Sequence, residues 1–298
     1  MPKATSQFQS GFSPFWLAYI FQIQTTRAWM LMTTLILVVA LVLVVPLVKR
    51  RFPGNVQLGI IIIASLPVLS TQFSWLGMYD PFIFLGLLIW GLGRSPLTWI
   101  TGGFIAASAN PEQVTVAALL AVIASLTLRI KPQRKQALYL LATSISAVGI
   151  SQFWFFLSGN ASSRAGEIND LLEPSLYAFS KFWPMYLWAV FGAFWLIALL
   201  TIVSLRSKSA GVLSIFVITG IPLLAAALTL DGFRVIALVA LPITLLIAGS
   251  FMDSISSHQW IRSYLAVGMI MLIIFTPPAE LGWPSIGPLI YDFLARIT

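Results

Sequence analysis

Residues 29–48 read WMLMTTLILVVALVLVVPLV, an unbroken apolar run between Arg27 and the basic sequence Lys49-Arg50-Arg51. A helix needs about 20 apolar residues to cross the roughly 30 Å hydrocarbon core of a membrane. The run has that length, and positive charges close it at one end. It is therefore predicted to form a membrane-spanning helix.

The composition of the whole chain extends this prediction. Of 298 residues, 59% are apolar and only 9% are charged, and the mean hydropathy is +0.94. An ordinary soluble domain has about 25% charged residues. These values exclude a soluble enzyme, a disordered tail and a fibrous repeat, and they favour a multi-pass membrane protein.

Residue counts exclude several kinds of site. The chain has no cysteine, which rules out disulfides, thiolate metal sites and iron–sulfur clusters. The single histidine, His258, excludes a His-rich zinc or di-iron site and haem held by two histidines of this chain. The sequence also contains no nucleotide-binding motif. The net charge of +8 would suggest a nucleic acid partner in a soluble protein. In a membrane protein the basic residues instead indicate which loops face the cytoplasm, so no nucleic acid partner is predicted.

Further apolar segments predict a polytopic bundle of helices. About ten crossings are expected, at residues 29–48, 56–73, 79–93, 97–109, 114–129, 137–157, 184–205, 211–230, 235–251 and 263–277. The third and fourth are short and rich in glycine, so they form either two short crossings or a re-entrant pair. The predicted fold class is all-α, with residues 1–298 forming a single transmembrane domain.

Basic residues predict which loops face the cytoplasm. Most of the 17 lysines and arginines fall in alternate loops, which the positive-inside rule places in the cytoplasm: Lys49, Arg50, Arg51, Arg94, Arg129, Lys131, Arg134, Lys135, Arg206, Lys208 and Arg262. The acidic residues were not used in that assignment. All but Asp253 of the nine fall on the other side: Asp80, Glu112, Glu167, Asp170, Glu173, Asp231, Glu280 and Asp292. They either follow the membrane potential outward or line an external active site.

The loops follow from this sidedness. An external segment at 1–28 is expected to carry an interfacial helix. Residues 12–23 are rich in aromatic side chains, which favour the membrane interface, and this stretch is too short to cross the membrane. Residues 158–183 form an external loop and residues 278–298 an external C-terminal segment, with both termini outside. The first 27 residues lack the pattern of a cleavable signal peptide. Translocation of an N-terminus without a preceding span is unusual, so a helix upstream of this chain is suspected.

Five short elements of residues 9–93 carry a family resemblance. In order they are Ser13-Pro14-Phe15-Trp16, Arg27-Ala28-Trp29, Lys49-Arg50-Arg51-Phe52, Ser65-Leu66-Pro67 and Met78-Tyr79-Asp80-Pro81. Their order and spacing resemble the polytopic GT-C glycosyltransferases, which use polyprenyl-phosphate-linked sugars. The resemblance implies glycosyl transfer at the outer face of a bacterial inner membrane or a plasma membrane, with membrane lipids and a polyprenyl-phosphate-linked sugar as partners. In that family the first outer loop carries a carboxylate, whereas this chain has no Asp or Glu before Asp80.

The candidate site residues lie at the predicted outer ends of the spans. Asp80 and Glu112 are the candidate catalytic carboxylates, because glycosyl transfer needs a base beside the acceptor hydroxyl. The candidate substrate-binding residues are Trp75, Tyr79, Asp231 and Arg234, of which Arg234 has the reach to contact a lipid phosphate. A divalent metal could also stabilise the leaving phosphate, but no metal ligands are assigned.

Structural roles compete with these assignments. Asp231 and Arg234 could instead form a local pair that caps the helix beginning there, and Asn110 could cap the helix that begins with Pro111 and Glu112. For the whole chain the alternatives are a membrane transporter or lipid flippase and a non-catalytic membrane scaffold subunit. A transporter is expected to show a polar path across the midplane, whereas nearly all ionisable residues here lie at span ends.

Overall fold

The computed structural model describes residues 12–74, 78–128, 131–158, 186–203, 215–227, 232–254 and 259–274, together with single residues and short pieces between 173 and 183. Regular structure in these ranges is helical throughout. The all-α prediction is therefore confirmed for the part of the chain that the structure describes.

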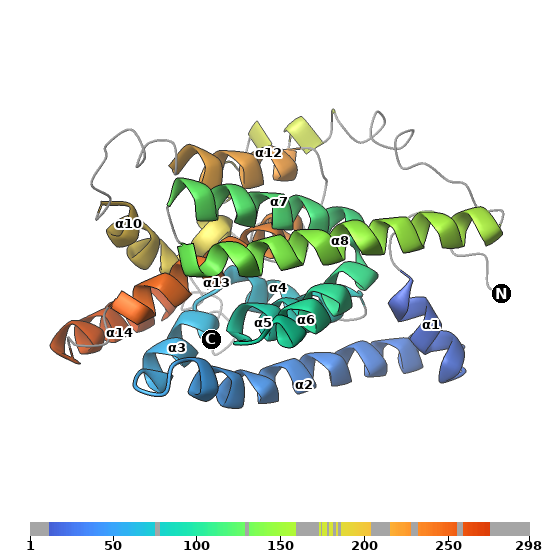
Figure 1. Ribbon diagram of the computed structural model, residues 1–298, viewed down its shortest axis with the longest axis horizontal. Helices are drawn as coiled ribbons and strands as arrows, with labels where there is room; N and C mark the ends of the chain where they lie inside the picture. Colours follow the sequence, from blue (N-terminus) through green and yellow to red (C-terminus); the bar gives the residue numbers. More distant parts are fainter. Residues whose placement is uncertain are drawn as a thin grey trace, which may run out of the picture.

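The helices follow the predicted apolar segments (Figure 1). Their bounds are α1 Ser13–Ile20, α2 Thr26–Arg51, α3 Val56–Ala64, α4 Pro67–Ser74, α5 Asp80–Leu92, α6 Pro96–Ala109, α7 Pro111–Thr127, α8 Lys131–Ser158, η2 Gly192–Phe194, α10 Trp195–Val203, η3 Phe216–Gly220, α12 Ile221–Ala227, α13 Gly232–Ser254 and α14 Gln259–Ile274. In the described ranges, three helical stretches are long and apolar enough to cross a membrane: Thr26–Arg51, Gln133–Trp154 and Arg234–Asp253.

Helix α2 is apolar on the side that packs against the bundle and also on the side that is exposed. Its inward stripe consists of Thr33, Leu37, Ala40, Val44 and Val48, spaced three or four residues apart as one face of a helix requires. Its outward face exposes further aliphatic side chains: Leu31, Leu35, Val38, Val39, Val42 and Val45. Such a continuous apolar surface is unfavourable in water and is what a lipid-facing helix presents.

Helix α5 lies at the centre of the bundle. Almost every residue of this helix is buried, and it packs against α2, α6 and α13. Figure 1 shows α5 and α6 between the long helices α2 and α8. Close approach of α5 and α6 depends on Gly86 and Gly102, since a Cβ on either one would lie 2.6 Å from the carbonyl oxygen of the other. Small residues at such crossings are typical of helices packed in membranes.

The predicted short pair forms a helical hairpin. Helix α5 ends at Leu92, and the next helix begins after Ser95, whose hydroxyl accepts a hydrogen bond from the backbone of Thr98 in a capping box. The indole of Trp99 donates to the Gly93 carbonyl at 2.9 Å and closes the turn. The Gly93 carbonyl is thus bonded, whereas Arg94 and Leu97 at the same turn are exposed.

Two predicted spans are interrupted, which differs from the continuous helices expected. The segment 56–73 breaks between α3 and α4, where Pro67 begins the second helix. The segment 184–205 bends at Gly192, whose φ of +55° lies in the left-handed region that glycine tolerates. A Cβ on Gly192 would lie 2.9 Å from the Ser65 carbonyl oxygen and 2.9 Å from Cγ of Pro67. The two breaks are thus packed against each other.

Two ion pairs mark the ends of α13. Arg234 in its first turn contacts Asp80 at the start of α5, and Asp253 in its last turn contacts Arg51 at the end of α2. The stretch Arg234–Asp253 has 20 residues, or about 30 Å at 1.5 Å per residue. That length equals the thickness of a bilayer's hydrocarbon core. We call these the Asp80 end and the Arg51 end of the bundle.

Candidate functional site

The Asp80 end is held by an ion pair between distant parts of the chain. Nε of Arg234 lies 3.4 Å from Oδ2 of Asp80, and the two side chains are only 11% and 2% exposed. Removing two charges from water is expensive, so such a pair persists only where its partners are held in place. Asp80 and Arg234 are therefore brought together, as candidates for one site should be.

Each member of this pair lies at a helix N-terminus. Asp80 opens α5 just before Pro81, a position that favours helix initiation, and its negative charge faces the positive end of the helix dipole. Arg234 in the first turn of α13 has the unfavourable sign for its own helix. The carboxylate of Asp80 offsets that repulsion.

A second contact joins a third helix N-terminus to this end. Nδ2 of Asn110 donates to the Tyr79 hydroxyl at 3.3 Å, and Oδ1 of Asn110 accepts from the backbone nitrogen of Gln113. Asn110 is thus the N-cap of α7, as one of the two sequence-based interpretations proposed. Tyr79 directly precedes Asp80, so the N-termini of α5, α7 and α13 are linked through these contacts.

The other predicted site residues have different positions. Glu112 lies in the first turn of α7, two residues after Asn110, with an exposed side chain. Trp75 and Asp231 lie outside the described residues, and so does His258. The alternative of a local Asp231–Arg234 pair is therefore untested, but Arg234 does pair with Asp80. In the described ranges, no group of three or more His, Cys, Asp or Glu residues is placed to hold a metal ion.

Sequence reasoning missed Gln72. This residue lies on α4, which packs against α5 and α13, and it is only 1% exposed. Neither its amide nitrogen nor its amide oxygen has a hydrogen-bond partner in the part of the chain that the structure describes. Burying an amide without hydrogen-bond partners costs free energy, so Gln72 is a candidate for contact with a ligand. The sequence did offer one signal for Gln72, which is a polar amide inside an otherwise apolar segment.

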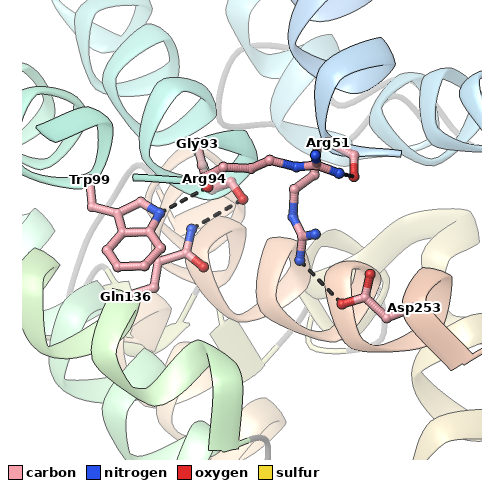
Figure 2. Close-up of polar contacts among 7 residues, drawn as sticks. Arg51, Gly93, Arg94, Trp99, Gln136 and Asp253 are labelled. Atoms are coloured by element: carbon pink, nitrogen blue, oxygen red, sulfur yellow. Dashed lines mark hydrogen bonds and ion pairs between the residues drawn. The ribbon is translucent and has the colours of Figure 1, made fainter. Parts of the chain in front are cut away.

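The Arg51 end is built differently, with more exposed charges. Figure 2 shows Arg94 reaching the Arg51 carbonyl, at 2.7 Å, while the Arg51 guanidinium contacts Asp253 at 3.2 Å. Gln136 of α8 donates to the carbonyls of Trp90 and Gly91 in the last turn of α5. These carbonyls have no partner within their own helix. This end therefore brings together Arg51, Arg94 and Asp253, three of the residues that the sequence assigns to the cytoplasm.

Comparisons with known proteins give no relative. The chain matches no protein-family model, no curated protein and no solved structure. The architecture and the two charged ends are therefore the basis for any functional assignment.

Proposed function

We propose that this chain is a multi-pass membrane protein of about ten crossings that transfers a sugar from a polyprenyl phosphate at the outer face. The Asp80 end would face outward and the Arg51 end the cytoplasm. The basic residues of the Arg51 end and the buried Asp80–Arg234 pair at the other end support this orientation. The segment around α1 would lie outside, since the Phe12 backbone bonds to Ser108 near the end of α6.

The observation that carries the proposal is that the Asp80–Arg234 ion pair and the Asn110–Tyr79 hydrogen bond link three helix N-termini. Helix N-termini bind anions through their free backbone N–H groups and their dipoles. A guanidinium adds a fork of donors that matches phosphate geometry. The N-termini of α5, α7 and α13, with Arg234, would therefore stabilise the phosphate that leaves the sugar.

The proposed reaction uses Asp80 as the proton acceptor. The acceptor hydroxyl oxygen forms a bond to the anomeric carbon, the bond from that carbon to the phosphate oxygen breaks, and the hydroxyl proton passes to the carboxylate. Polyprenyl phosphate leaves with the bonding electron pair. Because Asp80 is 2% exposed and paired with Arg234, binding of the donor phosphate to Arg234 would have to release this carboxylate. Glu112, which is exposed in the first turn of α7, is the second candidate base.

The test measures sugar transfer from a polyprenyl-phosphate donor in membranes that contain the chain. Asp80→Asn and Arg234→Gln should each lower the rate at least about 100-fold, the usual effect of losing a general base or an electrostatic stabiliser. Asp253→Asn makes the same chemical change at the other end and should leave transfer intact. Absence of transfer by the wild-type protein, or full activity of Asp80→Asn, would remove the proposed chemistry.

Gln72→Leu separates a ligand-binding role from a structural one. Replacing an unpartnered buried amide with an apolar side chain of similar size should leave stability unchanged or higher. If Gln72 contacts the donor or acceptor, the same variant should transfer sugar more slowly. A variant as active as wild type would place Gln72 outside the site.

A transporter is the second candidate, favoured by the two interrupted helices. Broken helices that meet, here at Pro67 and Gly192, are typical of transporter binding sites. Against it, the buried Ser and Thr hydroxyls in the middle of the helices mostly bond to carbonyls of their own helix, as in Thr33, Thr143 and Thr244. Among the described residues, ionisable groups lie near helix ends. Solute uptake abolished by Gly192→Ala, with no sugar transfer in the wild type, would favour the transporter.

A further inference from the structure

At the Arg51 end, side chains from two helices lie over one glycine of a third. Gly249 is a buried residue of α13, one turn before Asp253. Its Cβ position would lie 3.5 Å from Nη2 of Arg51 and 3.7 Å from Nε2 of Gln133. Two hydrogen-bond donors, from Arg51 and Gln133, therefore lie close to the position that a side chain at residue 249 would occupy.

The surroundings of this point are positively charged. Figure 2 shows Arg94 and Arg51 side by side, with Asp253 as the carboxylate that Arg51 contacts. Lys49, Arg50 and Lys135 are exposed on the same helix ends. In the described part of the chain, Asp253 is the acidic residue seen at this end, so the basic charges clearly exceed the acidic ones.

Two buried polar atoms in the first turn of α8 have no hydrogen-bond partner among the described residues. Gln133 is only 4% exposed, and its Oε1 has no hydrogen-bond partner among the residues that the structure describes. Nε of Arg134, the next residue in the first turn of α8, is buried and has no partner in the same ranges. Buried polar groups in proteins are almost always bonded, so a ligand that bonds to these atoms would be favourable.

We propose that the side chains of Arg51 and Gln133 bind a phosphate group beside Gly249, where the missing Cβ leaves room for it. A guanidinium binds phosphate through charge-assisted hydrogen bonds, and the Gln133 amide supplies a donor beside it. The phosphate belongs either to an anionic lipid headgroup or to a free phosphate anion. A headgroup hydroxyl or a phosphate hydroxyl could also donate to Oε1 of Gln133.

Asp253 competes with this ligand. Its side chain is 51% exposed, and an ion pair that exposed contributes little stability. A phosphate can therefore take its place on Arg51 while the carboxylate turns to water. This site lies at the opposite end of α13 from Asp80, and its occupancy does not depend on the proposed sugar transfer.

The experiment measures binding by the purified full chain in phosphatidylcholine nanodiscs, with phosphatidylglycerol or inorganic phosphate as the probe. Wild type should bind one of these probes, read as a rise in melting temperature and as bound lipid in native mass spectra. Binding of phosphatidylglycerol alone identifies a lipid site, and binding of both probes, with competition between them, identifies a general phosphate site. Binding of neither overturns the proposal.

Gly249→Leu tests the location without changing charge. A leucine there would fill the space between Arg51 and Gln133 and should weaken binding about tenfold or more, the loss expected from one charge-assisted hydrogen bond. Gly149→Leu is the matched control, because it adds the same side chain on α8 where nothing lies within 4 Å of the Cβ position, and it should bind the probe as wild type does. Equal binding by Gly249→Leu and wild type overturns the proposal.

Two further variants decide the matter if Gly249→Leu fails to fold. Gln133→Met removes the amide donor with little change in shape and should weaken binding, whereas Asp253→Asn removes the competitor and should tighten it. Lys135→Gln changes an exposed charge on the same helix as Gln133 and should have a smaller effect than Gln133→Met. A larger effect of Lys135→Gln would indicate diffuse attraction to the basic surface and overturn the site.

Discussion

The guanidinium of Arg234 lies 3.4 Å from the Asp80 carboxylate, and this contact joins the N-termini of α13 and α5 inside the bundle. Because both side chains are almost fully buried, each would leave an uncompensated charge if the other were removed. The pair therefore links the stability of the fold to the geometry of the proposed outer site.

The first prediction concerns this pair. Asp80→Asn and Arg234→Gln should each destabilise the protein by about 3–5 kcal/mol, because each leaves one buried charge without its partner. The double variant should be less destabilised than the sum of the two single variants. Thermal denaturation of the purified protein in detergent, run as a double-mutant cycle, measures the difference.

The Arg51–Asp253 pair is the control for that cycle. Its side chains are 18% and 51% exposed, so Asp253→Asn should cost at most about 1 kcal/mol. Additive effects of Asp80→Asn and Arg234→Gln would mean that these two side chains do not interact in the folded protein.

The second prediction concerns the crossing of α5 and α6. A Cβ at Gly86 would collide with the Ala106 backbone nitrogen and lie 2.8 Å from the Ala106 Cβ. Gly86→Ala should therefore lower stability by roughly 1–3 kcal/mol or more, the range for overpacking a tight interface. The melting temperature in detergent measures this effect.

Gly149→Ala provides the matched comparison, because nothing lies within 4 Å of that Cβ position on α8. There the substitution should be neutral or stabilising by roughly 0.4–1 kcal/mol, since alanine favours the helix. If both variants behaved alike, α5 and α6 would not approach each other as closely as described.

The third prediction concerns the interlock of α5 and α8. Trp90 donates its indole N–H to the Gln136 carbonyl at 2.9 Å, and the Gln136 amide donates to the carbonyls of Trp90 and Gly91. Gln136→Leu leaves two carbonyls at the end of α5 without this donor. It should cost about 2 kcal/mol or more, measured by thermal denaturation.

Gln152→Leu is the control on the same helix, since the Gln152 side chain is exposed. It should change stability by less than about 0.5 kcal/mol. A loss of similar size in both variants would show that the Gln136 amide is not what holds the end of α5.

Much of this architecture was predictable from local sequence. Apolar runs located the helices, and prolines such as Pro81 and Pro111 marked helix starts, because proline fits the first turn. The distribution of charge grouped Arg51, Arg94 and Asp253 at one end, where the structure also places them. Each of these patterns depends on residues close together in the chain.

Long-range contacts could not be read in the same way. Apolar runs do not say which helices meet, so the pairing of Arg234 with Asp80 and of Asn110 with Tyr79 needed the structure. The breaks at Pro67 and Gly192 were also missed as a matched pair. A proline or a glycine inside an apolar segment is compatible with a continuous membrane helix as well as with a broken one.

The most direct test of the account is the sidedness of the two ends. The chain has no native cysteine, so single cysteines at exposed Glu112 and Arg50 can be labelled without background. In intact cells, a membrane-impermeant maleimide should label Glu112→Cys, and it should label Arg50→Cys only after the membrane is permeabilised. Labelling of both positions from the same side, or of Arg50→Cys alone in intact cells, would contradict an outward-facing Asp80 end.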